Sequence, residues 1–203
     1  MLINPSTSEI VIAGCDEAGR GCLVGPVVAA AVVFSENFCH SELNDSKVLN
    51  AATRERLALV IKANALSYGI GIATESEIDQ INILQASFLA MHRALSLLRV
   101  SFQKIVVDGN RFRPFHEIPH ECIVKGDAKI VQIAAASILA KTTRDAIMHD
   151  LHTEYPYYGW NKNMGYPTCQ HREALLSHGI SPYHRKTYKT VACLQPRLFD
   201  SED

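Results

Sequence analysis

The sequence predicts an α/β fold in which helices cover both faces of a mixed central sheet. Two apolar runs follow each other near the N-terminus, which indicates a hairpin. Further strand patterns then alternate with amphipathic helical patterns, and a last helical pattern lies near the C-terminus. Strands that begin as a hairpin and then alternate with helices favour one mixed sheet, to which a C-terminal helical segment is added.

The first half of the chain contains the hairpin, one helix and a third strand. Residues 10–15 form an apolar run typical of a buried strand, and residues 24–34 form a second run rich in valine and alanine. Residues 53–65 place leucine, valine and isoleucine on one helical face, and residues 68–73 have a strand pattern. Asn82 then marks the expected entrance to a long helix.

The second half continues the alternation of strands and helices. Residues 83–98 repeat apolar side chains at helical spacing, and residues 104–107 form a short apolar strand that ends at a turn. Residues 118–124 predict one more strand. Residues 130–149 predict a helix whose three successive alanines allow close approach to the sheet, and residues 168–177 predict another helix that begins at a capping threonine.

Composition indicates an ordinary globular chain. Its 203 residues are 47% hydrophobic and 20% charged, and this length suits one compact domain. We expect that domain over residues 1–193 and a short tail over residues 194–203. The formal net charge of -1 excludes no partner, because acids in one cleft and bases at its rim can cancel.

The cysteines and the N-terminus indicate a reducing compartment. The six cysteines lie far apart and include no Cys-x-x-Cys pair, so neither a zinc site nor a redox motif is expected. The N-terminus has no basic segment followed by a long apolar run, and no run approaches the roughly 18 apolar residues of a membrane span. We therefore expect a cytoplasmic protein that does not bind a membrane.

Acidic residues stand where several predicted elements begin or end. Asp16 and Glu17 follow the first strand, Asp108 follows a later one, and Asp127 precedes the alanine-bearing helix. If the sheet brings them together, these four carboxylates form a nest suited to Mg²⁺ or Mn²⁺. Two carboxylates about 5 Å apart repel by roughly 3 kcal/mol at an effective dielectric constant of about 20, so the nest requires protons or cations.

Two considerations count against a single acidic nest. Each acid could form a separate salt bridge with Arg20, Arg111 or Lys125, although a strand end is an unusual place for a solvated ion pair. Side chains on a regular strand also alternate between faces. Asp16 and Glu17 therefore cannot both face one ion unless the pleat breaks or Glu17 contributes its backbone carbonyl.

The tripeptide Gly19-Arg20-Gly21 follows the acidic pair directly. The next glycine, Gly25, misses the spacing of a dinucleotide-binding loop, and acids immediately upstream would repel a pyrophosphate. The two glycines instead let the backbone approach a ligand closely, because no side chain holds the ligand away.

Seven motifs, in this order, resemble bacterial ribonuclease HII. They are Asp16–Gly21, Asn44–Lys47, Asn82–Ala86, Asp108–Asn110, Lys125–Asp127, Ala134–Lys141 and Gly165–Thr168. The resemblance covers residues 10–190, which is nearly the whole chain.

The resemblance implies an RNase H-like fold and a metal-dependent endonuclease that hydrolyses RNA paired to DNA. It also implies incision of duplex DNA on the 5′ side of an embedded ribonucleotide, at the RNA–DNA junction, with 3′-hydroxyl and 5′-phosphate ends. Two divalent ions, Mg²⁺ or Mn²⁺, would be the cofactors of a two-metal hydrolysis. Such an enzyme is expected to be a monomer that acts in ribonucleotide excision repair and DNA replication.

The resemblance also implies roles for individual residues. The family's four acidic positions, which bind metal and perform catalysis, fall on Asp16, Glu17, Asp108 and Asp127. The backbone of Gly19-Arg20-Gly21 and the ring of Tyr166 fall on the groups that recognise the ribonucleotide's 2′-hydroxyl, the group that distinguishes RNA from DNA. Lys47 falls on a phosphate contact. Many members carry lysine where this chain has Met164, so one phosphate contact is missing here or is supplied by Lys162.

Two C-terminal segments are candidates for partner binding. His184-Arg185-Lys186, with Lys189, forms a basic stretch, which favours a nucleic-acid backbone contact over a solvated tail. The segment 195–199 resembles the short peptides with which replication and repair proteins bind a sliding clamp. Its clamp contacts would be Gln195, Leu198 and Phe199.

The sequence leaves two alternatives. Ribonuclease HIII shares the chemistry, but Arg20 between two glycines and the lack of an N-terminal extension favour ribonuclease HII. A non-catalytic protein that binds RNA/DNA hybrids would use the acids structurally, and the intact acidic quartet argues against that. A transition-metal site at His116, His120 and Cys122 is disfavoured because their spacing fits no standard site.

Overall fold

The computed structural model describes residues 2–43 and 49–194, and these contain a five-stranded sheet of order β3-β2-β1-β4-β5. The strands are β1 (Ile12–Ala18), β2 (Val27–Val33), β3 (Ser67–Ala73), β4 (Lys104–Asp108) and β5 (His120–Ile123). β2 pairs antiparallel with both β1 and β3, whereas β4 pairs parallel with both β1 and β5. The sheet is therefore mixed, as predicted.

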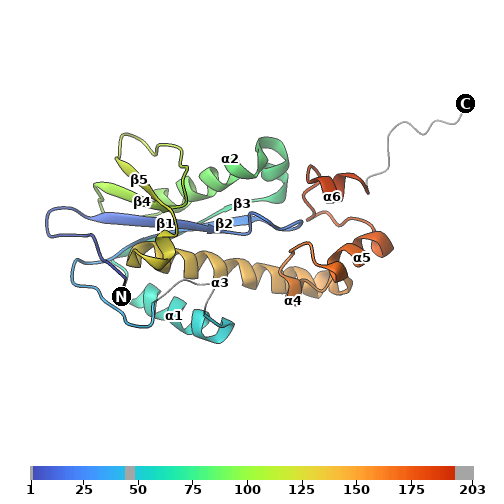
Figure 1. Ribbon diagram of the computed structural model, residues 1–203, viewed down its shortest axis with the longest axis horizontal. Helices are drawn as coiled ribbons and strands as arrows, with labels where there is room; N and C mark the ends of the chain where they lie inside the picture. Colours follow the sequence, from blue (N-terminus) through green and yellow to red (C-terminus); the bar gives the residue numbers. More distant parts are fainter. Residues whose placement is uncertain (1, 44–48, 195–203) are drawn as a thin grey trace, which may run out of the picture.

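Helices cover both faces of this sheet (Figure 1). The α-helices are α1 (Ala51–Asn64), α2 (Glu75–Ser96), α3 (Val131–Glu154), α4 (Trp160–Asn163), α5 (Cys169–His178) and α6 (Lys189–Ala192). Two short 3₁₀ helices are η1 (Gly126–Ala128) and η2 (Pro156–Tyr158). α2 lies on one face, α1 and α3 lie on the other, and α4 to α6 gather at one end (Figure 1). Both the covered sheet and the C-terminal helical segment are confirmed.

Among the described residues, no helix is apolar and long enough to cross a membrane.

The central strands show why the sheet has two covered faces. All seven residues of β2 are buried, as expected for valines and alanines with a helix layer on each side. In β1, Ala13 and Cys15 belong to the core cluster that includes α2 side chains, and Gly14 lies against α3. A Cβ atom on Gly14 would lie 2.3 Å from the Cβ of Gln132, so only glycine allows α3 this close to β1.

The first strand differs from its predicted bounds in a way that matters for the acids. β1 continues to Ala18 rather than ending at residue 15, and its antiparallel pairing with β2 includes Asp16↔Ala30 and Glu17↔Ala29. Asp16 and Glu17 therefore lie within the strand, not after it. The prediction failed there because charged residues usually mark the end of a buried strand.

Helix α2 begins earlier than predicted. Asn82 has a non-helical backbone (φ 67°, ψ 163°), and its side-chain oxygen accepts hydrogen bonds from the N–H groups of Leu84 (3.0 Å) and Gln85 (3.2 Å). Asn82 thus begins a new helical segment, as predicted. The segment before it was missed, although Thr74 and Glu77 form a capping box that marks its start.

The C-terminal helices have an apolar core of their own. Trp160 and Tyr158 are buried, and their rings stack with centroids 4.7 Å apart. Leu23 and Val24, from the connection between β1 and β2, belong to the same cluster. This packing joins the C-terminal helices to the connection that follows the acidic pair.

Candidate active site

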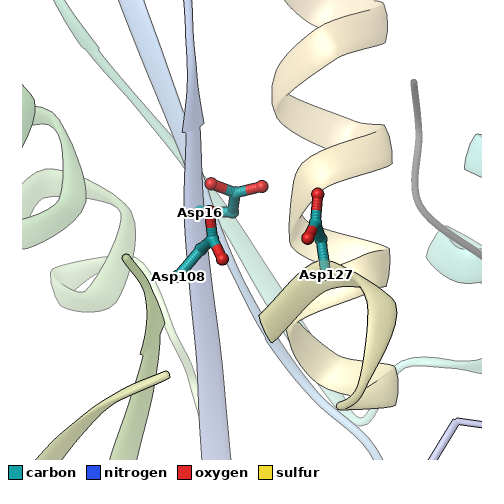
Figure 2. A group of neighbouring side chains, drawn as sticks. All are labelled: Asp16, Asp108 and Asp127. Carbon is teal, nitrogen blue, oxygen red and sulfur yellow. The ribbon is translucent and has the colours of Figure 1, made fainter. Parts of the chain in front are cut away.

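Three carboxylates from separate elements meet at one end of the sheet (Figure 2). Asp16 lies on β1, Asp108 ends β4, and Asp127 lies in η1. The parallel register places Cys15 opposite Val107, so Asp16 and Asp108 continue side by side from neighbouring strands. One oxygen atom from each of the three carboxylates lies within 4.8 Å of the other two.

Backbone and side-chain donors orient these carboxylates. The Gly126 N–H donates to Oδ1 of Asp108 at 2.7 Å, and the Glu17 N–H donates to Oδ1 of Asp16 at 2.7 Å. Ser137, on α3, forms a side-chain hydrogen bond with Asp16. Donors from β1, α3 and the first residue of η1 thus orient Asp16 and Asp108.

The electrostatics of Asp16 fit a cation-binding role. Burial raises the pKa of this carboxyl well above its usual range, and the negative charges of Glu17 and Asp108 raise it further. The hydrogen bonds from Ser137 and from the Glu17 N–H lower the pKa by less. A divalent cation would relieve this cost of ionisation, and three carboxylates form the oxygen-rich donor set that Mg²⁺ and Mn²⁺ prefer. The residues present therefore fit a divalent metal site.

Glu17 does not belong to this group of three. The strand is regular at this point, so its side chain leaves the sheet on the opposite face from Asp16. Its Oε1 accepts a hydrogen bond from Nη1 of Arg20 at 3.0 Å in an ion pair. Burial raises the pKa of Glu17 despite the opposing effect of Arg20. Of the two alternatives for Glu17, the break in the pleat is absent, which leaves the backbone carbonyl as the route from Glu17 to the same ion.

Asp16, Glu17 and Asp108 share a cleft with the residues predicted to recognise the ribonucleotide. The cleft has a volume of about 360 Å³ and is lined by Asp16, Glu17, Ala18, Gly19, Arg20, Gly21, Arg54, Asp108, Ser137, Lys141 and Tyr166. A Cβ atom on Gly21 would lie 3.6 Å from Cε1 of Tyr166, so the ring lies beside the glycine loop. Tyr166 is 45% exposed, which leaves much of it open to solvent.

Three polar lining residues were not predicted as site residues. They are Arg54, Ser137 and Lys141. Ser137 carries a sequence signal, because it is the one polar residue in the apolar run Ile133–Ala140. Lys141 forms an ion pair with Asp145 on α3 at 2.8 Å, and both side chains are partly buried.

A buried arginine joins the two loops of the cleft. The Arg144 guanidinium donates to three backbone carbonyls, those of Val24 (3.1 Å), Pro26 (3.2 Å) and Met164 (2.8 Å). The first two acceptors follow the glycine loop and the third precedes Tyr166. Arg144 thus fixes the spacing between the two predicted recognition elements.

A chain of buried imidazoles also reaches the Tyr166 loop. His184 Nδ1 accepts from the Ser181 N–H at 2.9 Å, so its Nε2 carries the proton and donates to Nε2 of His171 at 3.2 Å. His171 Nε2 also accepts from Trp160, so its Nδ1 donates to the Tyr166 carbonyl at 2.9 Å. Burial lowers the pKa of both histidines, that of His184 to about 3.

One sequence interpretation is wrong. His184 and Arg185 were assigned to a nucleic-acid contact, but both are fully buried. Arg185 donates instead to backbone carbonyls of the glycine loop, including that of Gly19 at 2.7 Å. Lys186 and Lys189 are exposed. The basic run resembled a solvent-facing surface because nothing local in the sequence reveals distant carbonyl acceptors.

Some predicted contact residues lie outside the described part of the chain. These are Lys47, Gln195, Leu198 and Phe199. Met164, where the resemblance led us to expect lysine, offers its backbone carbonyl to Arg144, and Lys162 nearby is exposed.

Comparison with known proteins identifies the family. The chain matches the family model of Ribonuclease HII over residues 13–191. It is 57% identical over 188 residues to Ribonuclease HII of Parabacteroides distasonis, with 93% of this chain and 94% of that protein covered. It is 54% identical over 190 residues to Ribonuclease HII of Christiangramia forsetii, with 94% and 96% covered.

Solved structures share the fold. The ribonuclease H2 of Pyrococcus horikoshii aligns with a TM-score of 0.76 at 31% identity, over 91% of this chain and 97% of that one. A chain of the PCNA:RNase HII complex from Archaeoglobus fulgidus aligns with a TM-score of 0.70 at 26% identity, over 93% and 98%. The predicted RNase H-like fold is confirmed. Since the family model spans most of the sequence and relatives match it nearly end to end, the chain belongs to the ribonuclease HII family.

Proposed function

We propose that this chain is a metal-dependent endoribonuclease that hydrolyses RNA paired to DNA. It also incises duplex DNA on the 5′ side of an embedded ribonucleotide, at the RNA–DNA junction, and leaves 3′-hydroxyl and 5′-phosphate ends. The observation that carries the proposal is the cleft in which two acids of the carboxylate group, Asp16 and Asp108, meet the glycine loop and Tyr166.

The acids provide the metal site of this enzyme. Asp16, Asp108 and Asp127 would hold two divalent ions, Mg²⁺ or Mn²⁺, and Glu17 is the fourth acid of the catalytic set. When bound, such ions supply an activated water and neutralise charge on the departing 3′-oxygen. The hydrogen bonds of Ser137 and Gly126 keep two of these carboxylates in place for that purpose.

The other side of the cleft recognises the ribonucleotide. Gly19, Arg20 and Gly21 offer backbone groups to the 2′-hydroxyl, which is the group that separates RNA from DNA at a given sugar. The Tyr166 ring lies beside Gly21 and packs against the neighbouring sugar, where an extra hydroxyl would fit poorly. Recognition and hydrolysis thus use adjacent parts of one surface.

The decisive experiment uses three labelled duplexes. One carries a single ribonucleotide, one is all DNA, and one is a long RNA/DNA hybrid. We expect Mg²⁺- or Mn²⁺-dependent cleavage of the first and third, none of the second, and no cleavage after chelation. Asp108→Asn should lower the cleavage rate by at least about 100-fold, because the site loses one anionic ligand.

The same experiment tests the alternative of a non-catalytic hybrid-binding protein. That alternative predicts binding of the hybrid with no product at any metal concentration. Full cleavage by Asp108→Asn in saturating Mg²⁺ would also contradict the proposed metal site.

Residues beyond the described chain extend the proposal to a partner. Gln195, Leu198 and Phe199 are proposed to bind a sliding clamp, and the related RNase HII from Archaeoglobus fulgidus was solved in complex with PCNA, which is such a clamp. Deletion of residues 195–203 should leave cleavage of short duplexes unchanged and remove binding to the bacterial clamp. Clamp binding at unchanged affinity after the deletion would end this proposal.

The cellular role follows from the proposed reaction. We place the enzyme in the cytoplasm, as a monomer of one domain, in ribonucleotide excision repair and in DNA replication. Lys47 is proposed to contact a substrate phosphate, as the resemblance to the family implies.

A further inference from the structure

We propose that Arg185 and Tyr188 are positioning residues for ribonucleotide recognition. They hold the carbonyls of Gly19 and Arg20 on the buried side of the glycine loop, so that the N–H groups of Arg20 and Gly21 face the cleft. This inference rests on the proposed function of the loop. It adds the side chains that set the orientation of the loop.

All five N–H donors of Arg185 have acceptors within the protein. They donate to Gly19 O (2.7 Å), Arg20 O (3.0 Å), Gly25 O (3.0 Å), Pro26 O (3.3 Å) and the Tyr188 hydroxyl (3.0 Å). A guanidinium has five donors, so none is left for a nucleic acid. The side chain is fully buried, which fits an internal support rather than a ligand contact.

Tyr188 completes the support. Its hydroxyl accepts the hydrogen bond from Arg185 and donates its own to the Arg20 carbonyl at 3.0 Å. The Arg20 carbonyl therefore receives two hydrogen bonds from the buried side. The guanidinium carbon of Arg185 also lies 5.3 Å from the centre of the Tyr188 ring, in a cation–π contact.

Peptide geometry converts these bonds into an orientation of the loop. The chain has no cis peptide bond among the described residues, and a trans peptide places its N–H opposite its carbonyl. Because the carbonyls of Gly19 and Arg20 point toward Arg185, the N–H groups of Arg20 and Gly21 point away from it. Within the described residues, neither N–H donates to a backbone carbonyl. Both belong to residues that line the cleft.

A buried cation is a costly way to fill space, since an apolar side chain of similar volume would avoid its desolvation. Burial lowers the pKa of Arg185, and its five hydrogen bonds offset the cost. Lysine carries only three donors in a different geometry, so it would leave loop carbonyls unpaired. The two Nη atoms of the planar guanidinium can each donate to one of two successive carbonyls, as Arg185 does to Gly19 and Arg20.

The test uses Tyr188→Phe, which removes one hydroxyl and keeps the ring. The matched control is Tyr183→Phe, in the same C-terminal segment. The hydroxyl that it removes donates to Glu154 at 3.2 Å and does not bond to the glycine loop. Three quantities are measured: kcat/KM on a duplex with one ribonucleotide, the Mg²⁺ concentration for half-maximal rate, and the affinity ratio for ribonucleotide-containing over all-DNA duplex in Ca²⁺.

We expect Tyr188→Phe to lower kcat/KM and the affinity ratio by about tenfold, the effect of one misplaced hydrogen bond. The Mg²⁺ requirement and all-DNA affinity should match those of Tyr183→Phe, because the carboxylates are untouched. Arg185→Lys should lower the same two quantities further. If the Arg185→Lys protein does not fold, the result for Tyr188→Phe alone tests the inference.

Three outcomes would overturn the inference. Unchanged discrimination in Tyr188→Phe would show that the hydroxyl does not set the loop, and a parallel loss of Mg²⁺ and all-DNA binding would show a general structural role. If the unsubstituted enzyme cleaves no ribonucleotide-containing duplex, the proposed function fails and this inference fails with it. The first two outcomes leave the proposed function intact.

Discussion

The backbone N–H of Gly126 donates a 2.7 Å hydrogen bond to Oδ1 of Asp108. This bond ties the turn that begins η1 to the last residue of β4. Asp127 follows Gly126 directly, so its carboxylate is placed by a neighbour that is itself attached to Asp108. Two of the three acids are thus held at a fixed spacing by the backbone, and their mutual repulsion cannot separate them without breaking the turn.

Asp16→Asn should raise the stability of the metal-free protein while it removes cleavage. Because folding raises the pKa of Asp16, the folded protein keeps this proton at pH values where the unfolded chain has lost it. The stability from this group is present below the usual aspartate range and is lost as pH rises through the folded pKa. At neutral pH, the neutral amide should therefore raise Tm by a few degrees, since about 1 kcal/mol shifts Tm by roughly 2–4 °C in a chain of this size.

Thermal unfolding with chelator and with Mg²⁺ checks this prediction. Mg²⁺ should stabilise the unsubstituted protein and have little effect on Asp16→Asn. The control is Asp150→Asn, which neutralises an exposed acid on α3. A lower Tm for metal-free Asp16→Asn would contradict the argument.

The Mg²⁺ requirement should rise as pH falls. A proton on Asp16 competes with the cation, and the raised pKa extends this competition to higher pH than an ordinary carboxyl would. The Mg²⁺ concentration for half-maximal rate should increase on acidification from neutral pH, and excess Mg²⁺ should restore much of the rate. A half-saturating concentration that does not change with pH would show that protons and metal do not compete at this site.

Alanine at Gly19 should lower the stability of the protein, whereas alanine at Gly21 should lower its activity. Gly19 has φ +99°, and its Cβ would lie 2.1 Å from Nε of Arg144, so Gly19→Ala should destabilise the fold by about 2 kcal/mol or more. Gly21 does not have positive φ, and its Cβ would make an ordinary 3.6 Å contact with Tyr166. Gly21→Ala should therefore keep Tm and lose ribonucleotide cleavage, because the new methyl group occupies the cleft.

Urea unfolding and cleavage of the single-ribonucleotide duplex separate the two effects. Equal loss of stability in both variants would contradict the geometry of the loop. Full activity in Gly21→Ala would show that substrate does not approach this glycine.

His184 should make the protein sensitive to acid. Its pKa falls from 6.5 to about 3 on folding, so the folded state binds fewer protons than the unfolded chain in that interval. The stability from neutral His184 is present above pH 6.5 and is lost as pH falls toward 3. From neutral pH to roughly pH 4.5, this loss amounts to about 2–3 kcal/mol.

His184→Asn tests the effect, because its amide oxygen can accept the Ser181 N–H and does not titrate. The free energy of unfolding of the variant should be lower at neutral pH and should fall less on acidification. His149→Asn, at an exposed position on α3, is the control. An identical acid slope in His184→Asn and the unsubstituted protein would assign the sensitivity to other groups.

The sequence was most informative where chemistry and local pattern coincide. Asp16 and Asp108 could be located because each follows apolar residues of a strand, and Asp127 because it precedes a recognisable helix. Asn82 could be recognised as a helix entrance because its short polar side chain suits a cap. The regular continuation of β1 through Glu17 could not be foreseen, since it depends on pairing with β2 and not on local residues.

The buried residues that hold the loops of the cleft in place were the hardest to predict. Arg144 and Arg185 are typical surface residues by type, and their acceptors are carbonyls distant in sequence. His171 and His184 likewise meet only when the C-terminal helices pack together. Backbone carbonyls carry no signal in an amino-acid sequence, so residues that bind them cannot be found from the sequence of one chain.

Asp16, Asp108 and Asp127 come from widely separated parts of the chain and meet only in the folded protein. An unfolded or partly synthesised chain therefore has no high-affinity place for the ions, and ion binding is added directly to the free energy of folding. A nascent chain gains its nuclease capacity only once β4 and η1 have joined β1. A divalent cation bound there would thus take part in the reaction and would also selectively stabilise the completed fold.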